Sequence, residues 1–243
     1  MITFLEYVAQ DLLDKYGTDM SGIAVVFPNK RASLFLNQAL ARMAGRPLWS
    51  PAYITISDFF RQHSELTVAD PIKSICDLYK TYGEVTGNVG ETLDQFYGWG
   101  QLLLADFDDI DKNMADAHRV FSNIRDLREL DDISYLNEEQ KAELHRFFAN
   151  FDDNPEGLKE RFIMLWGRLN DIYNQFKKKL HSQGLAYEGM LYREVVEDDD
   201  IQTQYKHYVF VGFNVLQKVE QRLFKRFKDE EKASFYWDYD HYY

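Results

Sequence analysis

Two kinds of hydrophobic pattern divide this chain. At residues 22–27 and again at 207–213, apolar residues follow one another without a break. Short runs of this kind, rich in β-branched residues, are typical of strands in a parallel sheet that is covered on both faces. Across residues 61–192 the apolar positions instead recur every three or four residues, which predicts helices. The pattern therefore predicts an α/β domain whose two parts are separated by a large all-helical subdomain.

Residues 1–60 are expected to form the first part of the α/β domain. The pattern predicts helices over 3–16 and 30–44, and strands over 22–27 and 53–56. Asn29 stands where it can cap the second helix. The side chains expected on the buried stripe of that helix are Leu34, Phe35, Ala39, Leu40 and Met43.

The segment 61–192 is expected to be the helical insertion. Helical spacing is clearest at 72–85, 92–104 and 158–180. Three acidic runs are expected at helix starts or in loops, where carboxylates complement exposed N–H groups and water. These runs cover residues 106–111, 151–156 and 196–200.

Residues 193–243 are expected to return to the α/β domain. A buried strand over 207–213 precedes a helix, and a further strand begins near Lys232. The residues expected to face inward after the first of these strands are Val215, Leu216, Val219, Leu223 and Phe227. The chain stops directly after a core strand, so we expect it to be a fragment of a longer protein.

Charge and cysteine content restrict the class of protein. The 28 basic and 40 acidic side chains give a net charge of −12, which argues against a free-standing nucleic-acid binder. The single cysteine, Cys76, cannot form an internal disulfide and fits a reducing compartment. The N-terminal stretch carries acidic residues at helical spacing, so the sequence predicts neither a signal peptide nor a membrane span. We expect a cytoplasmic protein.

The turn after the first strand holds a lysine where a phosphate-binding loop would hold one. Lys30 lies at the strand–helix junction and Ser33 follows one turn later, but Pro28 lacks an N–H and the turn contains no glycine. We therefore expect no ATP and no Mg²⁺ here. Two interpretations stay open: a capped turn with solvated Lys30 and Arg31, or a DNA phosphate or partner carboxylate held by Asn29, Lys30, Arg31 and Ser33.

The second strand of an ATPase would end in carboxylates, because Mg²⁺ and the attacking water need them. Gly212 and Phe213 stand at that position instead. Hydrolysis is thus unexpected on two independent grounds, and no catalytic residue is predicted.

Asp238, Asp240 and His241 gather at the end of the last predicted strand. Their donor atoms suit a metal, but adjacent side chains of an extended segment point to opposite faces and do not converge. We expect no metal site and favour use of these residues at a surface or interface.

The order of these pieces resembles the N-terminal helicase-like region of AddB/RexB-type subunits of bacterial helicase–nucleases, which belong to the PD-(D/E)XK nuclease family. Asp238, Asp240 and His241 resemble helicase motif III in their spacing. The stretches that carry the resemblance are 25–40 in the motif I position, 51–60, 184–196, 208–224 in the motif II position, and 235–243.

The resemblance implies a RecA-like parallel sheet with a helical insertion, in a protein that processes double-strand DNA ends during recombination repair. It also implies that a partner helicase subunit supplies translocation and that the nuclease site lies in a further domain. This chain is then a non-enzymatic scaffold that contacts DNA ends within the full-length protein. The alternatives are a protein-interaction domain without DNA contact and an ATPase with an atypical phosphate loop.

Overall fold

The computed structural model describes residues 3–87, 92–126 and 165–238. The chain forms two compact units. The first comprises Met1–Ser64 together with Glu194–Tyr243, and the second comprises Glu65–Arg193.

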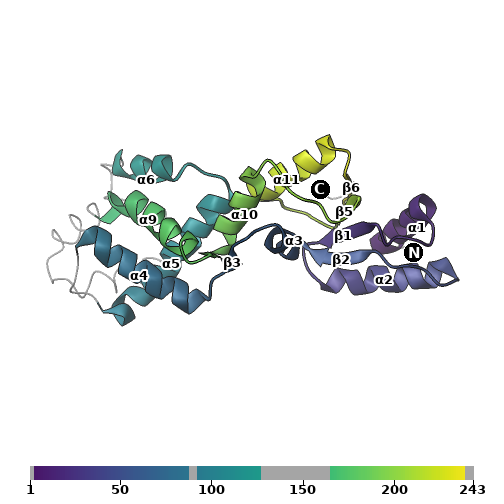
Figure 1. Cartoon of the computed structure of the whole chain (residues 1–243), viewed down its shortest axis with the longest axis horizontal. Helices are drawn as coiled ribbons and strands as arrows, with labels where there is room; N and C mark the ends of the chain where they lie inside the picture. The colour runs from purple at the N-terminus through teal and green to yellow at the C-terminus, as the bar shows by residue number, and fades with distance from the viewer. Residues whose placement is uncertain (1–2, 88–91, 127–164, 239–243) are drawn as a thin grey trace. The chain divides into compact units, whose positions relative to one another are not determined.

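A four-stranded parallel sheet forms the centre of the first unit (Figure 1). Its strands, in the order β2-β1-β5-β6, are Ala52–Thr55 (β2), Ile23–Phe27 (β1), His207–Val211 (β5) and Ala233–Tyr236 (β6). Every neighbouring pair runs parallel, and Val25 is in register with Tyr53 on one side and Val209 on the other. The predicted class, an α/β fold with a parallel sheet flanked by helices, is confirmed.

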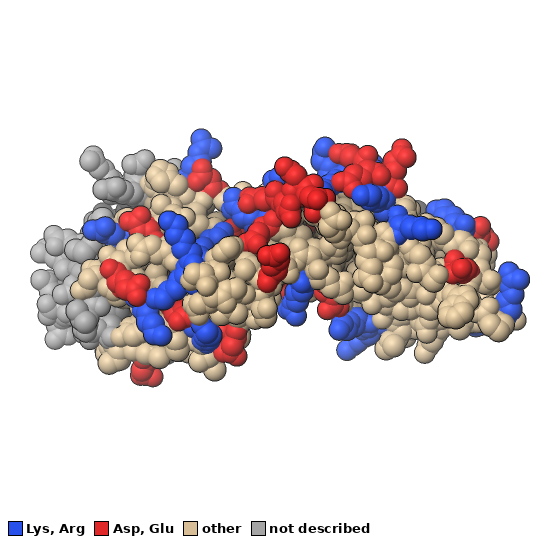
Figure 2. Space-filling view, viewed as in Figure 1, with Lys and Arg blue, Asp and Glu red and all other residues tan. Residues whose placement is uncertain are grey.

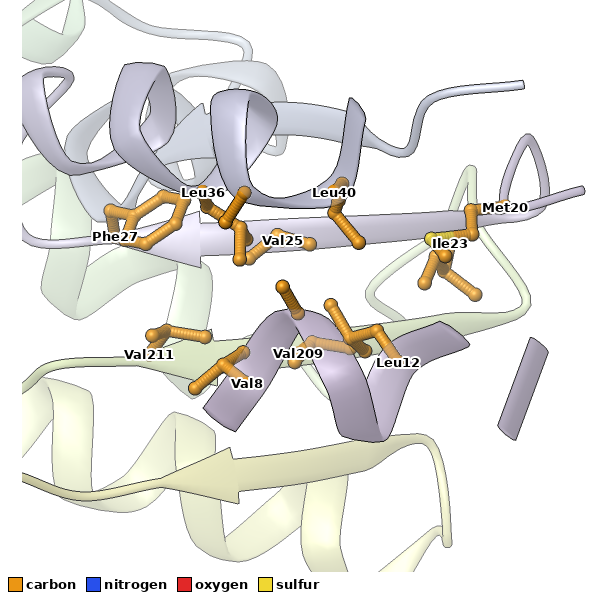
Figure 3. Close-up of a cluster of buried hydrophobic side chains, with 12 residues drawn as sticks. Val8, Leu12, Met20, Ile23, Val25, Phe27, Leu36, Leu40, Val209 and Val211 are labelled. Carbon is orange, nitrogen blue, oxygen red and sulfur yellow. The ribbon is translucent and has the colours of Figure 1, made fainter. Parts of the chain in front are cut away.

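Helices α1 (Phe4–Tyr16) and α2 (Arg31–Ala44) cover one face of this sheet. Val25 and Phe27 are two positions apart on β1, so both point toward these helices, as do Val209 and Val211 on β5. Figure 3 shows the buried cluster that results. Its helix residues are Val8, Ala9 and Leu12 of α1 and Leu36, Ala39 and Leu40 of α2.

Aromatic side chains fill the opposite face, where α3 (Ile56–Gln62) and α11 (Lys218–Asp229) pack. Tyr208 of β5 meets Phe59 of α3 edge-on, with ring centroids 5.5 Å apart. Phe210 lies 4.3 Å from Phe224 of α11, measured between ring centroids. Because helices cover both faces, the buried positions of β1 and β5, which are 23–27 and 208–211, carry no charged side chain.

The residues that the start of α2 buries are not the predicted ones. Leu34 and Phe35 were expected on the inner stripe, but their exposed fractions are 65% and 57%. Leu36 is fully buried in their place. Residues 34–36 are all apolar, and both Phe35 and Leu36 precede Ala39 by three or four positions, so periodicity alone could not choose between them.

The turn after β5 is also longer than predicted. Helix α11 begins only at Lys218, so Val215 and Leu216 lie in the loop before it, and Val215 is 90% exposed. The predicted inward positions Val219, Leu223 and Phe227 are buried. The glycine at 212 ends the strand with φ of +74°, which begins this irregular turn.

The second unit is mainly helical. Its helices are α4 (Pro71–Thr86), α5 (Leu93–Lys112), α6 (Ala117–Asp126) and α9 (Leu169–His181), and α10 (Glu188–Glu197) begins in it. The sequence predicts helices only, whereas β3 (Thr67–Val68) and β4 (Leu185–Ala186) pair in parallel. Strands of two residues are too short to produce a recognisable alternation of polar and apolar positions.

Two predictions within this segment need correction. The acidic run 106–111 is not a helix start, because α5 continues through it to Lys112 and buries Phe107, Ile110 and Asp111 on its inner side. The helix predicted over 158–180 falls partly outside the described residues, and from Leu165 onward a turn at Gly167 and Arg168 precedes α9. The run 151–156 also lies outside the described residues, while 196–200 spans the end of α10 and the loop after it.

Candidate functional site

The sheet order places a crevice between β1 and β5. The chain proceeds from β1 outward to β2 on one side, and from β5 outward to β6 on the other. Connections that leave adjacent parallel strands in opposite directions open a crevice at the carboxyl ends of those strands, where α/β proteins bind ligands. The end of β1 at Phe27 and the end of β5 at Val211 define this position.

A pocket of about 880 Å³ lies there. Phe27 and Val211 form its floor together with Pro28 and Gly212, which follow the two strands. Helices α1 and α2 supply its side walls. The wall residues are Thr3, Phe4, Leu5 and Glu6 from α1 and the residue before it, and Ala32, Phe35, Gln38, Ala39 and Arg42 from α2.

The beginning of α2 is not arranged as a phosphate loop. The side-chain oxygen of Asn29 accepts a hydrogen bond from the N–H of Arg31 at 3.1 Å, which occupies a donor of the first turn. Ser33 donates its hydroxyl hydrogen bond back to the carbonyl of Lys30 at 2.6 Å. The predicted contacts were Asn29, Lys30, Arg31 and Ser33. Of these four, Asn29 lines the pocket and the other three do not.

Lys30 pairs with a residue beyond the pocket wall. Its ammonium nitrogen lies 3.7 Å from Oδ2 of Asp58, and its side chain is 82% exposed. Asp58 belongs to the capping box of α3, where it accepts a hydrogen bond from the N–H of Thr55 at 3.1 Å. Burial acts to raise the pKa of Asp58, but the hydrogen bonds with Thr55 and the charge of Lys30 hold it below its usual value.

The beginning of α1 is capped in the same way. Thr3 and Glu6 form a reciprocal capping box, in which the N–H of Thr3 donates to Oε2 of Glu6 at 2.7 Å. The other oxygen of Glu6 accepts a hydrogen bond from Arg42 of α2. The N–H of Thr3 and the guanidinium of Arg42 lower the pKa of Glu6, so the carboxylate is ionised at neutral pH.

These contacts decide which ligands suit the pocket. At each helix start one first-turn N–H group donates to a local side chain, Glu6 to Thr3 and Arg31 to Asn29. The carboxylates of Glu6 and Asp238 line the wall. Arg42, the cation in the wall, is already paired with Glu6. An anion such as a triphosphate would meet occupied donors and two negative charges, so the pocket favours a ligand with an apolar body instead.

The end of β5 carries no acidic group. Gly212, Phe213 and Asn214 follow Val211, and the next carboxylate along the chain is Glu220 of α11. The N–H of Gly212 donates to the carbonyl of Tyr236 at 3.0 Å, which continues the pairing of β5 with β6. Among the residues that the structure describes, no group of three His, Cys, Asp or Glu side chains is placed to hold a metal.

Of the three residues that resemble motif III, the structure describes Asp238. Asp238 is exposed and lines the pocket. Asp240 and His241 lie outside the described residues. Upstream of them, Tyr236 donates its hydroxyl to Asp11 of α1, and Lys15 bridges the two, with 2.7 Å between its nitrogen and Asp11. This contact fastens the edge strand β6 to α1.

Sequence reasoning missed the side walls of the pocket. Glu6, Gln38 and Arg42 were not among the predicted contacts, and Phe35 was assigned to the core. The Thr-x-x-Glu spacing at residues 3–6 was the available signal for the cap of α1. The pairing of Glu6 with Arg42 joins residues 36 positions apart and leaves no pattern in a single sequence.

A second polar constellation lies in the helical unit and is closed. The carboxylate of Asp111 on α5 has no exposed surface. It accepts hydrogen bonds from the hydroxyls of Tyr173, at 2.6 Å, and Tyr187, and from Lys177 at 2.9 and 3.0 Å. Arg193 approaches to 3.3 Å. Four donors satisfy this carboxylate, so it is a structural junction of α5, α9 and α10 rather than an open site.

No protein-family model and no curated protein matches this sequence. Within the described ranges, none of the helices combines the length and the apolar composition that crossing a membrane requires.

Proposed function

We propose that this chain is a non-catalytic, helicase-like module of a cytoplasmic helicase–nuclease that processes double-strand DNA ends for recombination repair. In this role it is a scaffold for DNA ends and for a partner helicase subunit. The finer fold assignment that accompanies the proposal is a RecA-like sheet with a helical insertion. Its main support is the resemblance of the motif I, II and III positions, together with the altered chemistry of the pocket at those positions.

One observation supports the absence of ATP hydrolysis most strongly. Lys30, in the motif I position, lies 3.7 Å from Asp58 and is not part of the pocket wall. A phosphate loop needs its lysine and successive free N–H groups directed at the phosphates. Here Pro28 has no N–H, and the side chain of Asn29 engages the N–H of Arg31. The residues that follow β5 supply no carboxylate for Mg²⁺.

Binding of nucleotide gives the first test. A fluorescent ATP analogue would be titrated with the chain in the presence of Mg²⁺, and bound probe would be measured by anisotropy. We expect no saturable binding at millimolar nucleotide, either for the wild type or for Lys30→Ala. Tight binding that Lys30→Ala abolishes would favour the alternative, an ATPase with an atypical phosphate loop.

DNA binding gives the second test. A labelled duplex with a single-stranded tail would be titrated with the chain and with the longer protein that contains it, at two salt concentrations. We expect salt-dependent binding by the longer protein, because phosphate contacts release counterions. Replacing both Lys30 and Arg31 by Ala should weaken it. The matched control replaces Lys225 and Lys228, two exposed lysines of α11 on the opposite face of the sheet.

A second candidate function is protein interaction without DNA contact. It is favoured by three large apolar side chains exposed near α2, which are Leu34, Phe35 and Trp49. If neither chain binds the tailed duplex at low salt, the DNA role fails and this candidate replaces it. If the control at Lys225 and Lys228 weakens DNA binding as much as the change at Lys30 and Arg31, the role assigned to Lys30 and Arg31 also fails.

A further inference from the structure

The residues around α2 have a charge balance opposite to that of the whole chain. Residues 20–57 contain no Asp and no Glu, but they contain Lys30, Arg31, Arg42 and Arg46. The segment therefore carries four positive charges in a chain whose net charge is −12. Carboxylates of a partner would be attracted to this segment and repelled by most of the remaining surface.

The same segment exposes apolar side chains on one helix face. Positions 31, 34, 35, 38 and 42 of α2 share its outer side at helical spacing, and all five are exposed. Leu34 is 65% exposed and Phe35 is 57% exposed. Trp49, shortly after the helix, is 73% exposed. Figure 2 shows that the surface over α2 is mostly uncharged, with Lys or Arg side chains at its left-hand end.

This outer face continues into the pocket at the sheet edge. Phe35, Gln38 and Arg42 belong both to the exposed stripe and to the wall of the 880 Å³ pocket. An apolar strip beside a pocket of this size is the arrangement by which an amphipathic helix is bound, with one large side chain inserted as an anchor.

We infer that the outer face of α2, which we define as Arg31, Leu34, Phe35, Gln38 and Arg42, docks an acidic amphipathic helix of a protein partner. The apolar side of that helix covers Leu34 and Phe35. Its carboxylates face Arg31 at one end of this face and Arg46 just after the helix at the other, and one apolar side chain enters the pocket beside Phe35.

Carboxylates fit this face better than the phosphates of a nucleic acid do. Two of the four cations already pair with carboxylates of this chain, Arg42 with Glu6 and Lys30 with Asp58. The remaining two are few compared with the roughly six to ten phosphate contacts that a DNA-binding surface makes. The carboxylate of Asp238 in the pocket wall would repel either anion, so the group of the partner that enters the pocket is an apolar side chain.

The inference deepens the partner-binding half of the proposed function and rests on it. It does not depend on the DNA half, so the two can fail separately. Loss of binding to the tailed duplex would leave docking of an acidic helix intact. Failure of the peptide experiment below would leave the DNA results as they stand.

A designed peptide tests the inference directly. The probe is a labelled peptide of about 18 residues, long enough to form a helix alone, with leucines on one face and glutamates beside them. A second probe has lysine at every glutamate position, and a third is a labelled oligothymidylate. Each is titrated with the full chain, and binding is followed by fluorescence anisotropy at low and high salt.

Two pairs of variants locate the binding surface. Leu34→Gln with Phe35→Gln removes the apolar strip, and its control is Val215→Gln, which changes an apolar residue that is even more exposed and does not belong to this face. Arg31→Glu with Arg46→Glu reverses the charge, and its control is the same change at Lys225 and Lys228 of α11. All of these positions are exposed, so circular dichroism should show unchanged folding.

We expect the glutamate peptide to bind, and the apolar and charge variants each to weaken it by at least about tenfold while both controls retain wild-type affinity. Stronger binding of the lysine peptide would overturn the inference, as would unaltered affinity in the variants or no binding of any probe. Oligothymidylate that displaces the glutamate peptide and depends on Phe35 would instead make this face a nucleic-acid surface.

Discussion

Lys30 and Asp58 lie 3.7 Å apart, and this pair connects the turn after β1 with the first turn of α3. The lysine occupies the position that a phosphate-binding loop would use, yet it pairs with a carboxylate of a helix cap. The pair is exposed on the lysine side, where ion pairs contribute little to stability. The two partners should therefore respond differently to substitution.

Lys30→Ala is expected to change the free energy of unfolding by no more than about 0.5 kcal/mol, because it removes one solvated charge. Asp58→Ala should cost about 1 kcal/mol, since it also removes the acceptor for the N–H of Thr55. Urea denaturation followed by circular dichroism measures both. A larger loss for Lys30→Ala than for Asp58→Ala would show that the lysine has a structural role that this geometry does not include.

Charge in the middle of the sheet should prevent folding of the first unit. Val26 is fully buried, and its strand β1 lies between β2 and β5 in the sheet. Val26→Asp places an unpaired carboxylate there, and we expect a loss of several kcal/mol. Val26→Ala is the control, with a cost of about 1 to 3 kcal/mol from the lost side-chain contacts. Thermal melts of the two proteins would separate these outcomes, and a folded, cooperatively melting Val26→Asp would contradict the assigned burial.

The central strands could be predicted from the sequence because their chemistry is local. Residues 22–27 combine β-branched residues with flanking Gly22 and Pro28, and a doubly covered parallel strand is the structure that fits them. The parallel class of the sheet followed from the same reasoning. Strand order did not, because it depends on pairing between β1 and β5, which are some 180 residues apart, and a single sequence contains no signal for such pairing.

The pocket was predictable in position but not in composition. The loop after β1 was singled out because Lys30 stands where a phosphate-binding loop would hold a lysine, and Asn29 of that loop does line the pocket. Its side walls come from the outer side of α2 and from the start of α1. Phe35 could not be assigned there, because apolar residues at 34, 35 and 36 permit two inner stripes and only tertiary packing selects Leu36.

The junction at Asp111 should be among the most sensitive positions of the helical unit. Its buried carboxylate receives hydrogen bonds from Tyr173, Tyr187 and Lys177. Asp111→Ala would leave the ammonium of Lys177 without this partner, and breaking a buried ion pair from one side costs about 3 to 5 kcal/mol. Asp109→Ala, an exposed change on the same helix, should be nearly neutral.

Fluorescence of the buried Trp99 on α5, followed during urea denaturation, would report the loss at Asp111. Hydrogen exchange would locate the destabilised region, because the faster amide exchange should be confined to α5, α9 and α10. Lys177→Met together with Asp111→Leu should restore part of the stability, since the ammonium of Lys177 is then removed along with its partner and Arg193 keeps the carbonyl of Ala115 as an acceptor. Equal stability of Asp111→Ala and the wild type would contradict the assignment of Asp111 as a buried carboxylate that joins α5, α9 and α10.

The contact between Tyr236 and Asp11 predicts an alkaline limit to the stability of the first unit. Burial and the hydrogen bond to Asp11 raise the pKa of Tyr236 to about 12 from its ordinary value of 10.0. A raised pKa means that the folded state holds the proton more tightly than the unfolded state does. The corresponding stabilisation is complete below pH 10 and declines as the pH rises from 10 toward 12.

Tyr236→Phe should remove this pH-dependent stabilisation, because the variant keeps the ring but has no hydroxyl to titrate. At pH 8 the variant should lose about 1 kcal/mol, because the hydrogen bond to Asp11 is absent. Between pH 10 and pH 12 the wild type should lose stability more steeply than the variant, so their difference narrows. Chemical denaturation at a series of pH values measures this difference. Parallel curves over that range would mean that Tyr236 titrates alike in both states and that its contact with Asp11 does not persist in solution.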